Sequence, residues 1–542
     1  MKTHEVSNQS PPLEDVNLYD IDHPLREITR SGLDELSIEK IREYGALMGS
    51  PRWIRAGALA NQHGPVFHTH DYKGFRIDET EFHPSYHELM KLSIEYGLHA
   101  SPWEARTSGR HLARMAMYYL SGQNESGHGC PITMTFSSVP AIKKYLPQAD
   151  EWIPKILNDS YDSSNRPYYE KKGLTIGMAM TEKQGGTDVR ANTTKAIAID
   201  KKGSGEPYLL TGHKWFCSAP MCDAFLTLAQ TEVGLSCFLF PRWKPDGTKN
   251  DFRIQRLKDK LGNRSNASSE IEFDGAYAWL MGEEGRGVAT IIEMVALTRY
   301  DCMIGSSAII RRGLNEVLQH IHHRTVMGKT LAEQELMRNV VADLALESTA
   351  ALVLTTRVAL CLDRDQDKKE NLLLRLLTPI GKYWLTKRAS PFLVEAMECL
   401  GGNGYVEDSI LPRLYREAPV NAIWEGSGNV QCLDVIRAMS KSPEIVEVFF
   451  AELEKAKGFD AAYDQLISNI KTDLSHIDEY NARRITNQLA IAMQAAQLYD
   501  LYDAQFAKIF IASRTDKLGH FLYGSLADKA SIDYVLSKID WH

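Results

Sequence analysis

The hydrophobic period changes twice along the chain, and these changes limit the possible folds. From Ser37 to about Tyr145, apolar residues recur every three or four positions, as on the buried face of a helix. Around Lys195 the pattern becomes short alternating or apolar runs between turn residues, which predicts an antiparallel sheet or a small barrel. From about Glu284 the helical period returns and persists. The sequence therefore predicts a mainly α-helical protein with a central β-domain, whose strands are expected near 208–210, 224–229, 235–240, 252–254 and 271–273.

The length requires several folding units, because 542 residues exceed what one hydrophobic core supports. The long amphipathic helices expected after Glu284 are typical of a helical bundle. We expect five segments: an irregular N-terminal arm (1–30), an N-terminal helical domain (31–175), the central β-domain (176–282), a helical bundle (283–442) and a C-terminal helical extension (443–542).

Composition and charge narrow the possible classes of protein. A hydrophobic share of 44% and a charged share of 24% are those of a globular protein, and a net charge of -8 argues against general polyanion binding. The eight cysteines form no C-x-x-C pair and stand mostly among apolar residues, so we expect them to be reduced core residues. The chain start resembles no secretory signal, and we expect no membrane span and a cytoplasmic location.

Nucleotide-binding and metal-binding motifs are incomplete in this sequence. Gly401–Gly404 and Gly282–Gly287 do not complete G-x-G-x-x-G, and Gly328-Lys329-Thr330 lacks the first glycine of a P-loop. A Rossmann or P-loop enzyme is therefore not expected. The histidines at 68, 70, 83 and 87 lack a further ligand at fixed spacing, so no metal site is predicted.

One carboxylate, Glu425, stands between bulky apolar residues and a flexible polar turn. Ile423 and Trp424 are expected to exclude water from Glu425, which raises its affinity for a proton and suits a base that removes a weakly acidic C–H proton. The alternative is an ordinary solvated loop, since Glu is mostly exposed in proteins. The following residues allow close backbone approach or offer hydroxyl and amide groups to a polar ligand: Gly426, Ser427, Gly428 and Asn429.

Four further stretches carry polar groups at glycine turns or beside aromatic residues. Met178–Val189 joins an apolar strand to a glycine turn, His213–Ser218 places aromatic rings beside a hydroxyl, Lys260–Ser265 is a polar turn, and Cys399–Tyr405 ends a helix in glycines. Each alone is typical of a structural turn. Together with the Glu425 stretch, and in this order, they resemble the acyl-CoA dehydrogenase family of flavoproteins, over residues from about 100 to 440.

This resemblance implies a bound FAD between the β-domain and the bundle. The residues it implies for the cofactor are Met180, Thr181, Glu182, Gly185, Gly186, Thr187, Phe216, Cys217, Ser218, Arg324, Glu398, Gly402, Ile423, Trp424, Gly426, Ser427 and Asn429. Of these, Arg324, Glu398 and Gly402 would reach the FAD of a neighbouring subunit. The resemblance therefore also implies a homo-oligomer, expected to be a homotetramer.

The resemblance also implies the reaction. Glu425 would take the α-proton of an acyl-CoA thioester while the β-hydrogen leaves as hydride to the flavin. Thr187 and Arg299 would contact the substrate, and Thr298, at the family's other base position, cannot act as a base. Trp424 and Phe216 replace the family's usual Tyr and Trp, so the acyl slot is expected to be narrower and turnover slow.

Two alternatives remain at this point. One branch of the family is associated with DNA alkylation damage and binds DNA through a basic C-terminal region. The expected extension is richer in acidic than in basic residues, although five of its neighbouring cations would form a local patch if the fold gathered them: Arg437, Arg483, Arg484, Arg514 and Lys517. The other alternative is a flavoprotein that binds acyl-CoA without turnover, which needs the same residues.

Overall fold

The computed structural model describes residues 3–104, 107–516, 521–539 and 541. The chain divides into two compact units, and neither is one continuous segment. We call them the helical unit (Met1–Pro51, Ser108–Asn124 and Cys302–His542) and the sheet unit (Arg52–Thr107 and Glu125–Asp301). The segment expected as one N-terminal helical domain, 31–175, is thus shared between the two units.

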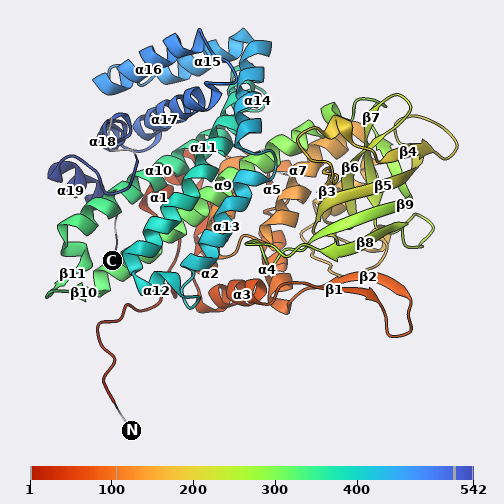
Figure 1. Cartoon of the computed structure of the whole chain (residues 1–542), viewed down its shortest axis with the longest axis horizontal. Coiled ribbons are helices and arrows are strands. Elements are labelled where there is room, and N and C mark those ends of the chain that lie inside the picture. The colour runs from red at the N-terminus through yellow and green to blue at the C-terminus, as the bar shows by residue number, and fades with distance from the viewer. Residues whose placement is uncertain (1–2, 105–106, 517–520, 540, 542) are drawn as a thin grey trace. The chain divides into compact units, whose positions relative to one another are not determined.

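The helical unit contains most of the long helices. They are α1 (His23–Gly32), α2 (Glu35–Met48), α6 (Arg110–Asn124), α10 (Glu335–Asp363), α11 (Lys368–Leu400), α12 (Gly402–Tyr405), α13 (Leu411–Ile423) and α14 (Gly428–Lys441), and the helix α9 (Gly287–His323) continues into it from the sheet unit. A short hairpin of β10 (Thr325–Val326) and β11 (Lys329–Thr330) follows α9. The C-terminal extension adds α15 (Pro443–Glu454), α16 (Ala461–Leu474), α17 (Ala482–Leu501), α18 (Ala504–Thr515) and α19 (Lys529–Ser537), the blue helices of Figure 1.

The irregular arm at the N-terminus is shorter than the sequence predicts. Asp22 accepts a hydrogen bond from the backbone N–H of Leu25 and thereby caps α1, with Pro24 in its first turn. The helix therefore begins at His23 rather than after residue 30. Part of the arm is fastened to the end of α9, where Ser10 Oγ lies 2.9 Å from His320 Nδ1.

The helix α10 is apolar enough over 18 residues to cross a membrane by composition, which the sequence analysis did not anticipate. However, 94% of that window is buried inside the protein. Its hydrophobic residues therefore belong to the core of the helical unit, where they pack with α11 and α17.

The sheet unit contains one seven-stranded sheet with helices and a separate hairpin. Its elements are α3 (Pro51–Gln62), β1 (Val66–His70), β2 (Arg76–Glu81), α4 (Pro84–Glu95), α5 (Ser101–Glu104), α7 (Gly129–Tyr145), α8 (Ala149–Ile156), β3 (Ile176–Ala179), β4 (Lys195–Ala198), β5 (Pro207–Ser218), β6 (Ala224–Gln230), β7 (Leu235–Pro241), β8 (Phe252–Leu257) and β9 (Ser268–Met281). Five of these strands contain the runs that the sequence predicts as strands: β5, β6, β7, β8 and β9.

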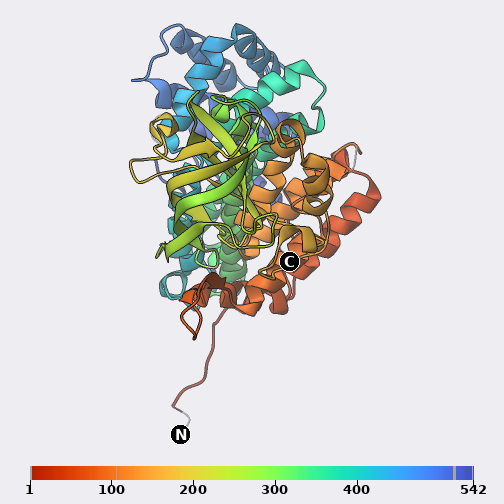
Figure 2. The ribbon, with the colours of Figure 1, turned by 90° about the vertical axis from the view of Figure 1, so that its right-hand side faces the viewer.

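The large sheet closes on itself as a small barrel. Its strand order is β3-β6-β4-β5-β9-β7, a further pairing joins β6 to β7, and β8 pairs with β9. Figure 2 shows this sheet in yellow and green. The expectation of an antiparallel sheet was partly wrong, because β6 runs parallel to both β3 and β4. The hairpin of β1 and β2 was also not expected, since the sequence predicts helix throughout that region.

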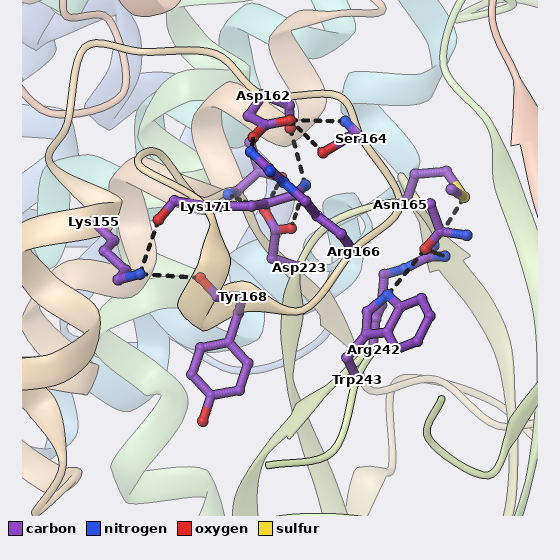
Figure 3. A network of polar contacts seen from close by, with 12 residues as sticks. Lys155, Asp162, Ser164, Asn165, Arg166, Tyr168, Lys171, Asp223, Arg242 and Trp243 are labelled. Atoms are coloured by element: carbon purple, nitrogen blue, oxygen red, sulfur yellow. Dashed lines mark hydrogen bonds and ion pairs between the residues drawn. The ribbon is translucent and has the colours of Figure 1, made fainter. Parts of the chain in front are cut away.

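A buried polar network fastens the segment between α8 and β3 (Figure 3). The ammonium group of Lys171 donates to Asp223 at 2.7 Å, and the same carboxylate accepts from the backbone N–H of Thr175 at 2.8 Å. Lys155 donates to the carbonyl oxygens of Tyr168 and Lys171. Paired buried charges of this kind fix where β3 begins, and the glycine turn follows directly after that strand.

Candidate functional site

The predicted base stands in a turn held by buried side chains. Glu425 has a φ of +57°, a left-handed conformation that is uncommon for residues other than glycine. Lys382 of α11 is fully buried, and its ammonium donates to the carbonyl oxygens of Trp424 at 2.8 Å and Gly426 at 2.5 Å. Gln431 donates through Nε2 to the carbonyl oxygens of Glu425 at 3.0 Å and Gly426 at 2.8 Å. These bonds hold the backbone of the turn in its strained conformation.

Lys382 and Gln431 were not among the predicted site residues. They act on backbone atoms, so no motif around Glu425 reveals them. The only sequence signal is the charge of Lys382, which falls three residues before the buried Leu385 on a helix with an apolar face.

The apolar wall expected around Glu425 is only partly formed within the helical unit. Trp424 is half-buried, and its indole Nε1 donates to Asn421 at 2.9 Å. Ile423 is 66% exposed, because it is the last residue of α13 and its side chain leaves the core. Within this unit, Trp424 rather than Ile423 therefore provides the apolar contact.

The turn leads into the first residues of α14, where the predicted polar groups gather. Ser427 occupies the N-cap position, but its hydroxyl makes no capping bond. Gly428 leaves room for a lysine of α11, since a Cβ there would lie 2.6 Å from Lys387 Cε. Asn429 is exposed. Backbone N–H groups at a helix N-terminus, a hydroxyl and an amide are donors that fit the diphosphate part of FAD.

The glycine turn of the sheet unit is fastened from within by Glu182. This side chain is fully buried, forms an ion pair with Lys214 at 2.8 Å and accepts from the backbone N–H of Thr193 at 2.6 Å. Burial alone raises the pKa of Glu182, but the bonds from Lys214 and Thr193 outweigh it and hold that pKa well below its usual range. The carboxylate of Glu182 therefore supports the turn, and a contact of this residue with the cofactor stays a prediction for its backbone alone.

The other predicted residues of this turn are exposed or half-buried. Met180 and Thr181 are half-buried, and Gly185, Gly186 and Thr187 are exposed. The carbonyl of Thr181 accepts from the N–H of Trp215 at 2.8 Å, which joins the turn to β5. This arrangement presents one surface of polar and glycine residues beside the end of β5.

The three consecutive residues predicted on β5 point in different directions. Phe216 is 49% exposed, with the Lys258 ammonium 4.8 Å from its ring centre. Ser218 Oγ lies 3.1 Å from Ser268 Oγ. Cys217 is fully buried, and burial raises the pKa of its thiol to about 12. The side chain of Cys217 therefore packs inside the barrel, and only its backbone is available to a ligand, which corrects its expected role.

The residues expected to reach a neighbouring subunit lie at or just beyond the C-terminal ends of α9 and α11. Glu398 and Gly402 flank the C-terminal end of α11, and Arg324 follows α9. Sixteen residues of helix separate Lys382 from Glu398, which is about 24 Å of helical rise. The Arg324 guanidinium donates to the carbonyl of Asn8 at 2.6 Å. Glu398 is thus far along α11 from the lysine that holds the Glu425 turn.

Arg299, expected on the substrate side, and Thr298, at the family's other base position, lie on α9 in its sheet-unit part. Arg299 is half-buried. Thr298 is buried, and its hydroxyl donates to the carbonyl of Val295 at 3.0 Å within the helix. Thr298 therefore has the structural role of a helix residue.

The described cations that could have formed a basic patch in the extension mostly have carboxylate partners of their own. Arg514 is buried between Asp343 and Glu347, Arg484 pairs with Asp473, and Arg437 lies 3.6 Å from Asp434. Lys517 lies outside the described residues. Arg483 instead contacts Asn429. These cations are dispersed and mostly neutralised by carboxylates, which removes the basis for the DNA-binding alternative.

The cysteines and histidines have structural surroundings. All eight cysteines are buried and free, as predicted. His68 Nε2 lies 2.9 Å from Glu81, His83 caps α4, and His87 Nδ1 lies 2.9 Å from the Tyr161 hydroxyl. Over the part of the chain that the structure describes, no group of three or more potential ligands could hold a metal ion.

Comparisons with known proteins agree with this geometry. Family models match three regions: the N-terminal domain of the adaptive response protein AidB (8–163), the acyl-CoA dehydrogenase middle domain (177–276) and the acyl-CoA dehydrogenase C-terminal domain (285–440). The chain is 44% identical to the putative acyl-CoA dehydrogenase AidB of Escherichia coli K12, over 96% of this chain and 95% of that one. It is 31% identical to acyl-CoA dehydrogenase family member 11 of Caenorhabditis elegans, over 77% of this chain and 69% of that protein.

A solved structure extends this likeness. The Caenorhabditis elegans protein ACDH-11 in complex with C11-CoA superimposes with a TM-score of 0.85 and 27% identity, covering 100% of this chain and 93% of that chain. The fold and the matching family models are those of the acyl-CoA-oxidising flavoprotein class. The chain belongs to the acyl-CoA dehydrogenase family, whose members are FAD-binding oxidoreductases. Its N-terminal domain is of the AidB type.

Proposed function

We propose that this protein oxidises a fatty acyl-CoA thioester between its α and β carbons, with Glu425 as the base that removes the α-proton. The observation that carries the proposal is the left-handed turn at Glu425, whose backbone carbonyls accept hydrogen bonds from Lys382 and Gln431. A strained residue fixed by buried hydrogen bonds is typical of a catalytic position. The bound FAD supplies the acceptor for the hydride that leaves the β carbon.

The bonds from Lys382 also orient the peptide groups around Glu425. A trans peptide points its N–H opposite to its carbonyl. Because Lys382 holds the carbonyl of Trp424, the N–H of Glu425 points away from Lys382, and the carbonyl of Gly426 orients the N–H of Ser427 in the same way. An outward N–H at Glu425 is suited to polarise a thioester carbonyl, which makes the α-proton more acidic.

Each unit, taken by itself, offers groups suited to a part of the cofactor. In the helical unit, Ser427, Gly428 and Asn429 offer donors to the diphosphate part of FAD. In the sheet unit, the backbone between Met180 and Thr187 and the exposed ring of Phe216 offer hydrogen bonds and a flat surface to a flavin ring.

The substrate and the assembly follow from the family. The relative ACDH-11 is described in complex with C11-CoA, so a fatty acyl chain of about that length is our first candidate substrate. Glu398 lies about 24 Å of helical rise from Lys382 on α11, which supports its serving a second subunit's cofactor, as proposed also for Arg324 and Gly402. We therefore propose a homo-oligomer, expected to be a homotetramer.

The Glu425→Gln variant tests the proposed base. We expect it to retain its yellow flavin but to lose anaerobic bleaching by acyl-CoA thioesters, because an amide cannot accept the α-proton. Absorbance near the flavin band, followed with short-, branched- and long-chain acyl-CoAs including C11-CoA, gives the readout. Glu447→Gln, an exposed change on α15, is the matched control and should bleach normally.

Two results would count against the proposal. If Glu425→Gln is reduced at the rate of the unaltered protein, Glu425 is not the base. If no acyl-CoA reduces the unaltered protein, the chain is a flavoprotein without acyl-CoA turnover.

A further inference from the structure

The C-terminal extension places an arginine beside the turn that starts α14. The acyl-CoA dehydrogenase C-terminal domain model ends at residue 440, so α17 lies beyond it. Arg483 stands in the first turn of α17, and its Nε donates to Asn429 Oδ1 at 2.8 Å. The neighbouring Ala482 is buried with Tyr383 and Cys432, which packs this end of α17 against α11 and α14. Arg483 is therefore held at the α14 N-terminus by the packing of its own helix.

A second cation reaches the same place from α11. A Cβ on Gly428 would lie 2.6 Å from Lys387 Cε and 3.3 Å from Lys387 Nζ, so the lysine stem lies directly over the glycine. Lys387 and Arg483 are both exposed. Two cations from two different helices therefore meet the partial positive charge of a third helix.

These two cations differ from others on the same helices. Arg484 pairs with Asp473 at 2.9 Å, and Arg388 pairs with Glu347 at 3.0 Å. Within the described residues, neither Lys387 nor Arg483 forms an ion pair with a carboxylate. Like charges gathered at a helix N-terminus repel one another, and a bound anion relieves that repulsion.

We infer that Arg483 and Lys387 bind the diphosphate of FAD, so that the C-terminal extension forms part of the cofactor site. The inference rests on the proposed role of Ser427 and Asn429 in holding the same cofactor. Only Nε of Arg483 is used by Asn429, which leaves both terminal nitrogens of the guanidinium for phosphate oxygens. The bond to Asn429 also fixes the plane of the guanidinium, so less side-chain freedom is lost when the anion binds.

The test is ligand binding to the full-length protein after removal of its flavin. We expect Arg483→Ala to raise the Kd for FAD about 10- to 100-fold, because a charge-assisted hydrogen bond to phosphate is lost. The Kd for ADP, which carries the same diphosphate, should rise by a similar factor. Riboflavin has no phosphate and should bind equally well to both proteins. Calorimetry measures ADP, and quenching of flavin fluorescence measures FAD and riboflavin.

Two variants control for indirect effects. Arg484→Ala removes the adjacent arginine, which is paired with Asp473, and should leave all three affinities unchanged. Arg483→Lys keeps the positive charge but loses the planar guanidinium, which can donate two parallel hydrogen bonds. It should therefore give an intermediate Kd for FAD. Circular dichroism checks that each variant is folded.

The inference is overturned if Arg483→Ala binds FAD and ADP as tightly as the unaltered protein. It is also overturned if the Kd for riboflavin rises as much as the Kd for FAD, since the effect would then come from a disturbed fold. No acyl-CoA is present in this experiment, so its outcome is separate from the question of whether Glu425 is the base.

Discussion

Lys382 offers a direct test of whether the turn around Glu425 needs its buried support. We consider Lys382→Met, which keeps an unbranched side chain of similar length but removes the ammonium. In the native turn this ammonium makes two hydrogen bonds, to the carbonyls of Trp424 and Gly426. Gly426 keeps its bond from Gln431 in the variant, whereas Trp424 loses its bond from Lys382.

The expected loss of stability can be estimated from these bonds. A hydrogen bond to a charged group contributes about 1.5 to 3 kcal/mol, and a buried carbonyl left without a partner costs about 1 to 3 kcal/mol. Part of this loss is offset because the variant no longer buries an ammonium, which costs several kcal/mol when poorly paired. We therefore expect a net destabilisation of about 2 to 4 kcal/mol.

The effect on activity should be larger than the effect on folding. Without Lys382, the left-handed conformation of Glu425 is no longer imposed and its carboxylate and N–H lose their fixed directions. A misplacement of about 1 Å at a reacting group costs roughly 100-fold in rate. We expect flavin reduction by saturating acyl-CoA to slow by about that factor, while bound FAD is retained.

The assay combines stopped-flow flavin reduction with thermal unfolding followed by circular dichroism. Lys369→Met, an exposed lysine on the same helix, is the control and should change neither measurement. If Lys382→Met loses stability but reduces its flavin at the normal rate, the left-handed turn is not needed for catalysis, and our reading of its strain is wrong.

Two further predictions concern the sheet unit and the α14 N-terminus. Burial alone raises the pKa of Glu125, but hydrogen bonds from His128 and Ser265 outweigh it and lower that pKa to about 2. Because the pKa of Glu125 is depressed in the folded protein, its contribution to stability is complete above about pH 4.5 and is lost as the pH falls toward 2, for a total of about 3 kcal/mol. The free energy of unfolding of Glu125→Gln, measured at several pH values, should therefore change less across this window than that of the unaltered protein. An equal pH dependence in the two proteins would contradict this. Gly428→Ala should fold normally, since the contacted Lys387 stem is flexible, but FAD titration should show weaker binding because the ammonium is displaced; unchanged FAD affinity would place Lys387 outside the site.

The sequence predicts well what depends on local pattern. The short alternating or apolar runs predicted as strands correspond to β5 to β9, because strand periodicity is a property of neighbouring residues. The turn around Glu425 was recognised for the same reason, since its glycines and polar residues are contiguous. The hairpin of β1 and β2 was missed because two short strands carry little periodic signal and lie between helices.

Side-chain direction is what the sequence could not provide. Glu182 and Cys217 stand within motifs that point to a cofactor, yet both side chains are buried inside the sheet unit. In a strand, successive side chains point to opposite faces, so Cys217 is buried between two residues that are not. Lys382 was missed for the converse reason: its partners are backbone atoms more than 40 residues away along the chain.

The arginines of the extension show why a count of charges does not identify a phosphate site. The sequence offers several basic residues there among more acidic ones, and this balance favours an ordinary solvated surface over a binding patch. What separates them is the partner of each: Arg484 and Arg514 face carboxylates, while Arg483 faces an amide oxygen. An arginine bonded to a neutral oxygen keeps its charge uncompensated, so its guanidinium still favours an anion. Because of this difference in partner, we expect Arg483 to contact the diphosphate of the flavin cofactor rather than the phosphates of DNA.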